Sequence, residues 1–229
     1  FQIFIDFYNF HFYISLSNLI PGIIAIVLMF GYEEPGVGQG MLARRIIPTK
    51  KTTLGGVLIA FLPLLIFPVA FFLFYFIYKP NTESFVINWY VLLFPIIGAF
   101  SVELGWRGYF LNKAGLTMHI FLATILTGIL WFLSNSYLYI NDVFLGITYM
   151  FLSVIINIIL TYLYFIFNRN ILLTYFFQLA YTYMYLYFTM LVPKDERFVF
   201  LLLLLFTIPA AFILLKNKAL FQIDKENDI

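Results

Sequence analysis

Seven long apolar runs follow one another along this chain of 229 residues. Hydrophobic residues make up 63% of the chain and charged residues 10%, whereas about 25% of the residues in a typical soluble domain are charged. Several of the runs reach the ~20 residues that an α-helix needs to cross a bilayer. The sequence therefore predicts an all-α fold, a polytopic bundle of transmembrane helices.

Polar segments separate the runs and set the predicted boundaries within a single transmembrane domain, residues 1–229. Residues 1–10 are predicted to be an interfacial stub or the end of a helix that begins upstream, which would add an eighth span. Residues 33–53 are predicted to form a cytoplasmic loop, and residues 216–229 a cytoplasmic tail. The seven predicted spans cover residues 11–32, 54–78, 88–111, 119–139, 142–167, 170–192 and 197–215.

The basic residues predict the orientation of these spans. Basic residues concentrate on the cytoplasmic side of membrane proteins. With the loop 33–53 inside, only Lys79, Lys194 and Arg197 fall outside. Ten basic residues then fall inside: Arg44, Arg45, Lys50, Lys51, Arg107, Lys113, Arg169, Lys216, Lys218 and Lys225. This asymmetry predicts a multi-pass protein of the cell membrane with a cytoplasmic C-terminus. The abundant Phe, Tyr, Ile and Asn are typical of an AT-rich bacterial genome.

Two opposite charges interrupt the third apolar run. Glu103 and Arg107 are four residues apart, and such residues share one face of a helix. A charge at this depth costs at least ~2.5 kcal/mol on insertion scales, so both charges need a reason. Either they form a neutralising ion pair that orients the helix, or they belong to an intramembrane active site. Pro95 and Gly98 precede them and predict a kink that turns the polar segment toward the bundle interior.

The same stretch carries a resemblance to a known family. The sequence Glu103-Leu-Gly-Trp-Arg107-Gly-Tyr109 resembles the first motif of the CPBP family, also called the Abi or type 2 CAAX-protease family, whose pattern is Glu-Glu-x-x-x-Arg. Val102 stands where the family has its first glutamate, the residue expected to activate water. The resemblance implies a CPBP-like fold for the bundle.

The resemblance also aligns later family motifs with non-catalytic residues. Trp131-x-x-x-Asn135 is similar to the second motif, which usually ends in histidine, and Gln178 with Thr182 is similar to the third. No catalytic residue is therefore expected, and the degenerate family positions are Val102, Glu103, Arg107, Asn135, Gln178 and Thr182. We predict instead a polar network between helices, made by Glu103, Arg107, Asn135, Asn157 and Gln178. Because there is no Cys, and because His11 and His119 have no metal-ligand spacing, no metal or cofactor is expected.

Three functions remain open at this point. The resemblance to the family's non-catalytic branch, the SpdC (LyrA) type, implies a scaffold or regulator that binds another membrane protein through its transmembrane helices. A cell-wall (peptidoglycan) hydrolase or synthase is the partner this branch suggests, besides membrane lipid, and nucleic acid is not expected. The first alternative is a divergent intramembrane protease in which Glu103 acts as the base. The second is a bacteriocin self-immunity protein.

Overall fold

The computed structural model describes residues 2–7, 10–15, 18–31, 54–79, 93–135, 142–192 and 195–217. Its N-terminal element is an antiparallel hairpin of β1 (Gln2–Phe7) and β2 (Phe10–Ser15), in which Gln2 pairs with Ser15. Aromatic and β-branched residues, which favour strands, fill this stretch. Residues 1–10 are therefore not the end of a helix, whereas their placement as an interfacial stub stays a prediction. The predicted span from residue 11 starts too early, because the first helix begins at Ile20.

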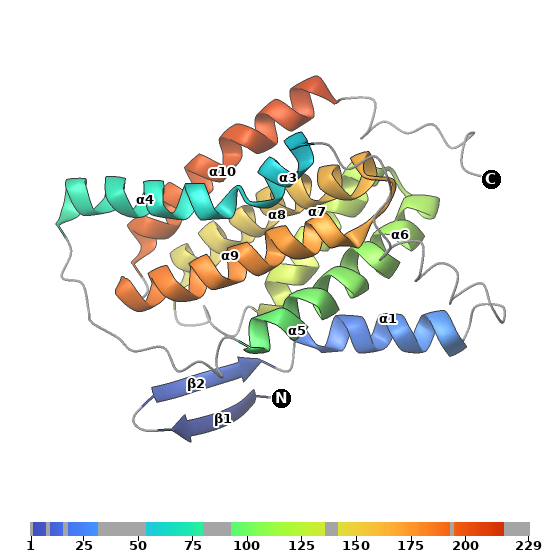
Figure 1. Ribbon diagram of the computed structural model, residues 1–229, viewed down its shortest axis with the longest axis horizontal. Coiled ribbons are helices and arrows are strands. Elements are labelled where there is room, and N and C mark those ends of the chain that lie inside the picture. Colours follow the sequence, from blue (N-terminus) through green and yellow to red (C-terminus); the bar gives the residue numbers. More distant parts are fainter. Residues whose placement is uncertain are drawn as a thin grey trace.

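Every other described element is a helix, and each predicted span contains one (Figure 1). The predicted loop 33–53 and tail residues 218–229 lie outside the described residues. The helices are α1 (Ile20–Gly31), α3 (Leu54–Ala60), α4 (Pro63–Tyr78), α5 (Leu93–Glu103), η3 (Leu104–Phe110), α6 (Leu111–Thr117), α7 (Ile120–Asn135), α8 (Val143–Ile166), α9 (Ile171–Leu191) and α10 (Glu196–Lys216).

Two of the described helices, α8 and α10, are long and apolar enough to cross a membrane. The helices α3 and α4 meet at a 46° bend, and they add a third candidate if the bent pair forms one span. Pro63 lies in the first turn of α4, where a proline costs no hydrogen bond because that N–H has no partner within the helix. These spans indicate a membrane protein, while the count of seven spans stays a prediction.

The helix α8 forms the centre of the bundle. In its most apolar window 61% of the residues are buried, against 33% for α10. Its main neighbours are α7 and α10. The contact with α7 depends on Gly128, where an added Cβ would lie 2.7 Å from Cα of Val154. Small residues allow such close approach between membrane helices, so the backbones of α7 and α8 nearly touch at this point.

Aromatic rings fill the space between α4, α9 and α10. Phe67 of α4 is fully buried, and its ring centroid lies 5.5 Å from Tyr181, 6.0 Å from Phe188 and 6.1 Å from Phe206. Centroid separations of 4.5–7 Å are the favourable range for aromatic pairs. This cluster joins three helices through ring contacts.

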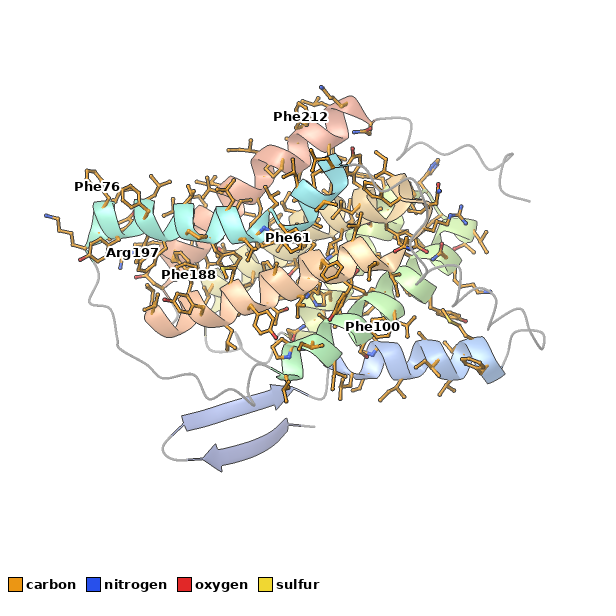
Figure 2. The ribbon with its side chains drawn as sticks, viewed as in Figure 1. Phe61, Phe76, Phe100, Phe188, Arg197 and Phe212 are labelled. Carbon is orange, nitrogen blue, oxygen red and sulfur yellow. The ribbon has the colours of Figure 1, made fainter. Side chains whose placement is uncertain are left out.

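The outer surface of the bundle is apolar as well. Phe76 of α4 is 75% exposed and Phe212 of α10 is 57% exposed, and Figure 2 shows both side chains directed away from the helices. Soluble proteins rarely expose large contiguous apolar patches. An exterior of this kind suits contact with lipid.

Candidate functional site: a buried ion pair on a π-helical turn

The charged motif lies on one continuous helix made of three parts. The eleven residues of α5 end at Glu103, the seven residues of η3 are π-helical, and α6 continues for seven more. A π-helix is rare and occurs frequently at functional sites. Pro95 falls in the first turn of α5, where proline is tolerated without a kink. The departure from α-helical geometry lies further on, in η3.

Glu103 and Arg107 form an ion pair inside the protein. Arg107 Nη1 lies 2.9 Å from Glu103 Oε1, and both side chains are completely buried. Arg107 Nη2 donates a second hydrogen bond to Asn157 Oδ1 of α8, and Asn157 Nδ2 donates to the Ser153 carbonyl 2.7 Å away. The pair thus connects the π-helical turn with the central helix.

The position of Arg107 changes the orientation argument made from the sequence. Arg107 was counted among ten basic residues on the cytoplasmic side, but its side chain is buried in the interior. Nine basic residues against three remain in that count. The excess of basic residues on the predicted cytoplasmic side, on which the orientation depends, therefore remains without Arg107.

Asn112 completes the π-helical turn. Its Nδ2 lies 2.6 Å from the Arg107 carbonyl, 3.3 Å from the Gly108 carbonyl and 2.7 Å from the Tyr164 hydroxyl of α8. Carbonyls that leave the regular α-helical pattern need another donor in a dry interior. Sequence reasoning missed this residue, and its only signal is an amide five residues after Arg107.

Ser101, two residues before Glu103, joins this helix to α1. Its hydroxyl donates to the Leu19 carbonyl at 2.8 Å and accepts from the Gly22 N–H at 3.2 Å. Gly22 lies in the first turn of α1, where N–H groups have no partner within the helix. Ser101 therefore caps α1 from a different helix.

Replacing Ser101 by alanine is expected to lower the free energy of unfolding by about 1–3 kcal/mol, because a buried N–H loses its acceptor. Thermal unfolding of the purified protein in detergent measures this loss. Thr117→Ala is the matched control, since the Thr117 hydroxyl donates to Ala114 within its own helix. Equal melting temperatures for the two variants would contradict the capping role of Ser101.

Gln178 and Thr182 lie on α9, and the hydrogen bond between them stays within that helix. Thr182 donates to the Gln178 carbonyl, and Thr174 lies beside the Glu103 carboxylate but donates to the Ile171 carbonyl. Among the buried polar atoms of the described residues, Glu103 Oε2, Arg107 Nε and Gln178 Oε1 have no hydrogen-bond partner. The Glu103 carboxylate therefore has one oxygen bonded to Arg107 and one oxygen without a hydrogen-bond partner.

Asn135 is not joined to the network that the sequence predicted. Its Nδ2 donates to the Trp131 carbonyl at 3.0 Å and to the Ser134 hydroxyl at 3.1 Å, both on its own helix. Gly128 lies level with Val154, and Asn135 is seven residues further on, about 10 Å along the helix axis. The structure connects Glu103, Arg107 and Asn157, and leaves Asn135 at the end of α7.

Val102 is buried among apolar neighbours, 2% exposed. It can neither bind water nor take up a proton at the position next to Glu103. Among the described residues, no group of three or more His, Cys, Asp or Glu side chains is placed to hold a metal ion. Within the part of the chain that the structure covers, the ionisable groups at this site are therefore Glu103 and Arg107.

Fold and site together define a helical protein, with two or three helices able to cross a membrane, whose centre contains a buried ion pair. Comparison with protein-family models and with curated proteins found no match for this chain.

Proposed function

We propose that this chain is a non-catalytic scaffold or regulator in the bacterial cell membrane, built like an inactivated CPBP intramembrane protease. In this proposal it binds and controls another membrane protein through its transmembrane helices, and a cell-wall enzyme is the partner we favour. The observation that carries the proposal is a closed ion pair, which here means that both charged side chains are shielded from solvent and bonded to each other. Glu103 and Arg107 are both completely buried and bonded to each other.

A closed pair is poorly suited to hydrolysis. A general base must come within hydrogen-bond reach of the water that it activates, and one oxygen of the buried Glu103 carboxylate is already bonded to Arg107. Val102 replaces the neighbouring carboxylate of the resembled family with an apolar side chain. What remains is an arrangement that fixes helices relative to one another, as a scaffold requires.

The apolar exterior supports partner binding within the membrane. Phe76 on α4 and Ile208 on α10 are 75% and 67% exposed. The proposed orientation, with the C-terminus in the cytoplasm, is checked by reporter fusions at the C-terminus. A C-terminal alkaline phosphatase fusion that is active outside the cytoplasm would contradict it.

Site-specific photocrosslinking in the native membrane tests the scaffold proposal. The crosslinking amino acid is placed at Phe76 or Ile208 of the tagged full-length chain, and at Phe67, which is buried, as the control. We expect one membrane protein, identified by mass spectrometry as a cell-wall enzyme, to crosslink at an exposed position and not at Phe67. If only lipid is captured at several such exposed positions, the scaffold proposal is wrong.

One observation keeps a second function in consideration. Glu103 Oε2 has no hydrogen-bond partner, so a divergent protease could use this atom to hold water. Cleavage of a membrane peptide by the native chain, lost in a Glu103→Gln variant that is shown to be folded, would establish this alternative. The scaffold proposal expects no cleavage by the native chain, and none by Val102→Glu, which restores only one of the degenerate positions.

A further inference from the structure

We propose that the π-helical segment η3 is a two-state switch, which rewinds to an α-helix and thereby turns the exposed face of α6 relative to the buried ion pair. The change takes place within the continuous helix made of α5, η3 and α6. It goes beyond the scaffold function and does not depend on the identity of any partner.

The π-helical turn brings Arg107 and Asn112 to the same side of their helix. The two residues are five positions apart, a spacing that places them about 140° apart on an α-helix. In a π-helix, residues five apart are joined by hydrogen bonds and lie one above the other. Arg107 bonds Asn157 of α8. Asn112 bonds Tyr164, seven residues further along α8, which is about two turns away on the same face. Both contacts with α8 therefore belong to the π-helical state, and an α-helical segment would turn one of them away.

Rewinding exchanges hydrogen bonds within the segment. At the end of η3 the Leu111 N–H donates to the Trp106 carbonyl, five residues back. In an α-helix it would donate to the Arg107 carbonyl, four residues back. Asn112 Nδ2 takes the place of this donor, 2.6 Å from the Arg107 carbonyl oxygen. The α-helical state returns that carbonyl to a backbone donor and releases the Asn112 amide. Two packings of similar free energy allow a segment to switch between them.

The first half of η3 is held by its neighbours on two sides. An added Cβ on Gly105 would lie 2.4 Å and 2.5 Å from atoms of Pro21 in α1, so the two helices nearly touch there. Arg107 is fixed by its ion pair and by Asn157. In the second half, the contact with α8 is made by the Asn112 amide, which the α-helical state releases. Arg107 is therefore the pivot of the switch, and the part that moves begins after it.

Rewinding changes what α6 presents at the surface. A shift from five-residue to four-residue hydrogen bonding turns the following residues by about 100° and moves them about 1.5 Å along the axis. Leu116 of α6 is 66% exposed. With a helix diameter of 10–12 Å including side chains, the end of this side chain moves by about 8 Å. A partner that contacts only one of the two positions shifts the equilibrium toward it. The switch thus links the surface of α6 to the turn that contains Arg107.

Distances between pairs of spin labels test the proposal. The chain contains no Cys, so introduced cysteines take the labels without background. One pair joins Leu116 to Leu215 of α10, and a second pair joins Leu116 to Leu58 of α3, all three exposed positions. Two reference positions detect a movement that lies perpendicular to one of them. Double electron–electron resonance is measured on the full-length chain in lipid nanodiscs.

Asn112→Leu is expected to shift the equilibrium toward the α-helical state, because it removes the donor that replaces the backbone N–H. At least one of the two distances should move by up to about 8 Å or acquire a second population at that separation. Tyr164→Phe removes only the hydroxyl that Asn112 contacts and should move the distances in the same direction. It also serves as the deciding variant if Asn112→Leu does not fold.

Asn135→Leu is the matched control, because it also replaces an amide by an apolar side chain. The Asn135 hydrogen bonds stay within α7, so both distances should remain native. If Asn112→Leu melts at a lower temperature but keeps the native distances, Asn112 is only a structural residue and the switch proposal is wrong. Equal shifts in Asn112→Leu and Asn135→Leu would also overturn it.

Deletion of Gly108 provides an independent test. The shortened segment can form a continuous α-helix in which Glu103 and Arg107 are still four residues apart. The Arg107 carbonyl then has a backbone donor, so adding Asn112→Leu should no longer change the distances. A shift of the same size with and without Gly108 would show that the π-helical turn is not the source of the movement, and would overturn the proposal.

Discussion

Glu103→Gln is expected to lower the free energy of unfolding by about 3–5 kcal/mol, because it leaves the Arg107 cation buried without its partner charge. Both side chains are fully buried and joined at 2.9 Å, so water cannot replace the lost carboxylate. Thermal unfolding of the purified protein in detergent, followed by circular dichroism, measures the change. A variant with native stability would show that water reaches the pair.

The double variant Glu103→Leu, Arg107→Met is the control for this prediction. Replacing both members of a buried pair by apolar residues is often neutral or stabilising. The remaining loss comes from the Arg107 hydrogen bond to Asn157, a contact of about 1–3 kcal/mol. The double variant should therefore be more stable than Glu103→Gln. The reverse order would mean that charge burial is not the source of the effect.

Gly128→Val is expected to lower stability by about 3 kcal/mol or more, at the upper end of the usual cost of overpacking. Even a bare Cβ at this position would lie 2.7 Å from Cα of Val154 and 3.2 Å from its backbone nitrogen. These are backbone atoms, so α7 and α8 must separate to make room. The melting temperature in detergent and the yield of folded protein measure the effect.

Gly31→Val is the matched control, because an added Cβ at Gly31, at the end of α1, has no neighbour within 4 Å. Its stability should change by less than about 0.5 kcal/mol beyond the small propensity difference. If Gly128→Val and Gly31→Val melt at the same temperature, the close contact between α7 and α8 does not contribute as described.

The positions of the helices could be predicted from the sequence because their ends have local signals. Asp142 accepts from the Leu145 N–H at 2.9 Å, Asn170 from Leu172 at 2.7 Å and Asp195 from Arg197 at 3.0 Å. Each is a polar residue just before an apolar run, where N-terminal caps are preferred. The predicted spans 142–167, 170–192 and 197–215 accordingly agree with the helices to within a few residues.

The N-terminal hairpin was missed because a short apolar segment fits more than one kind of structure. Residues 2–15 combine aromatic and β-branched side chains with few polar ones, and such runs are ambiguous between helix and strand. They were assigned to a stub and to the start of a helix. Their pairing in β1 and β2 is a contact between two segments, which the composition of either segment alone does not reveal.

At the site, the pair itself could be predicted but its surroundings could not. The four-residue spacing of Glu103 and Arg107 was enough to predict their contact. Asn157 could be predicted because it belongs to a polar stripe on α8. Asn112 and Ser101 could not, because their partners Tyr164 and Gly22 are distant in sequence. Asn135 was predicted to join the network but does not. Its distance from the ion pair is set by the register of α7 against α8, which the sequence does not show.

The short helix α1 has a consequence for how this protein is made. Its twelve residues span about 18 Å, less than the ~30 Å of a hydrocarbon layer. Pro21 has no N–H, and the Gly22 N–H is satisfied by Ser101, which the ribosome adds 79 residues later. Until α5 has been synthesised, the start of α1 has no acceptor away from water. The start of α1 therefore reaches its final hydrogen bonding only after α5 has been synthesised and has packed against it.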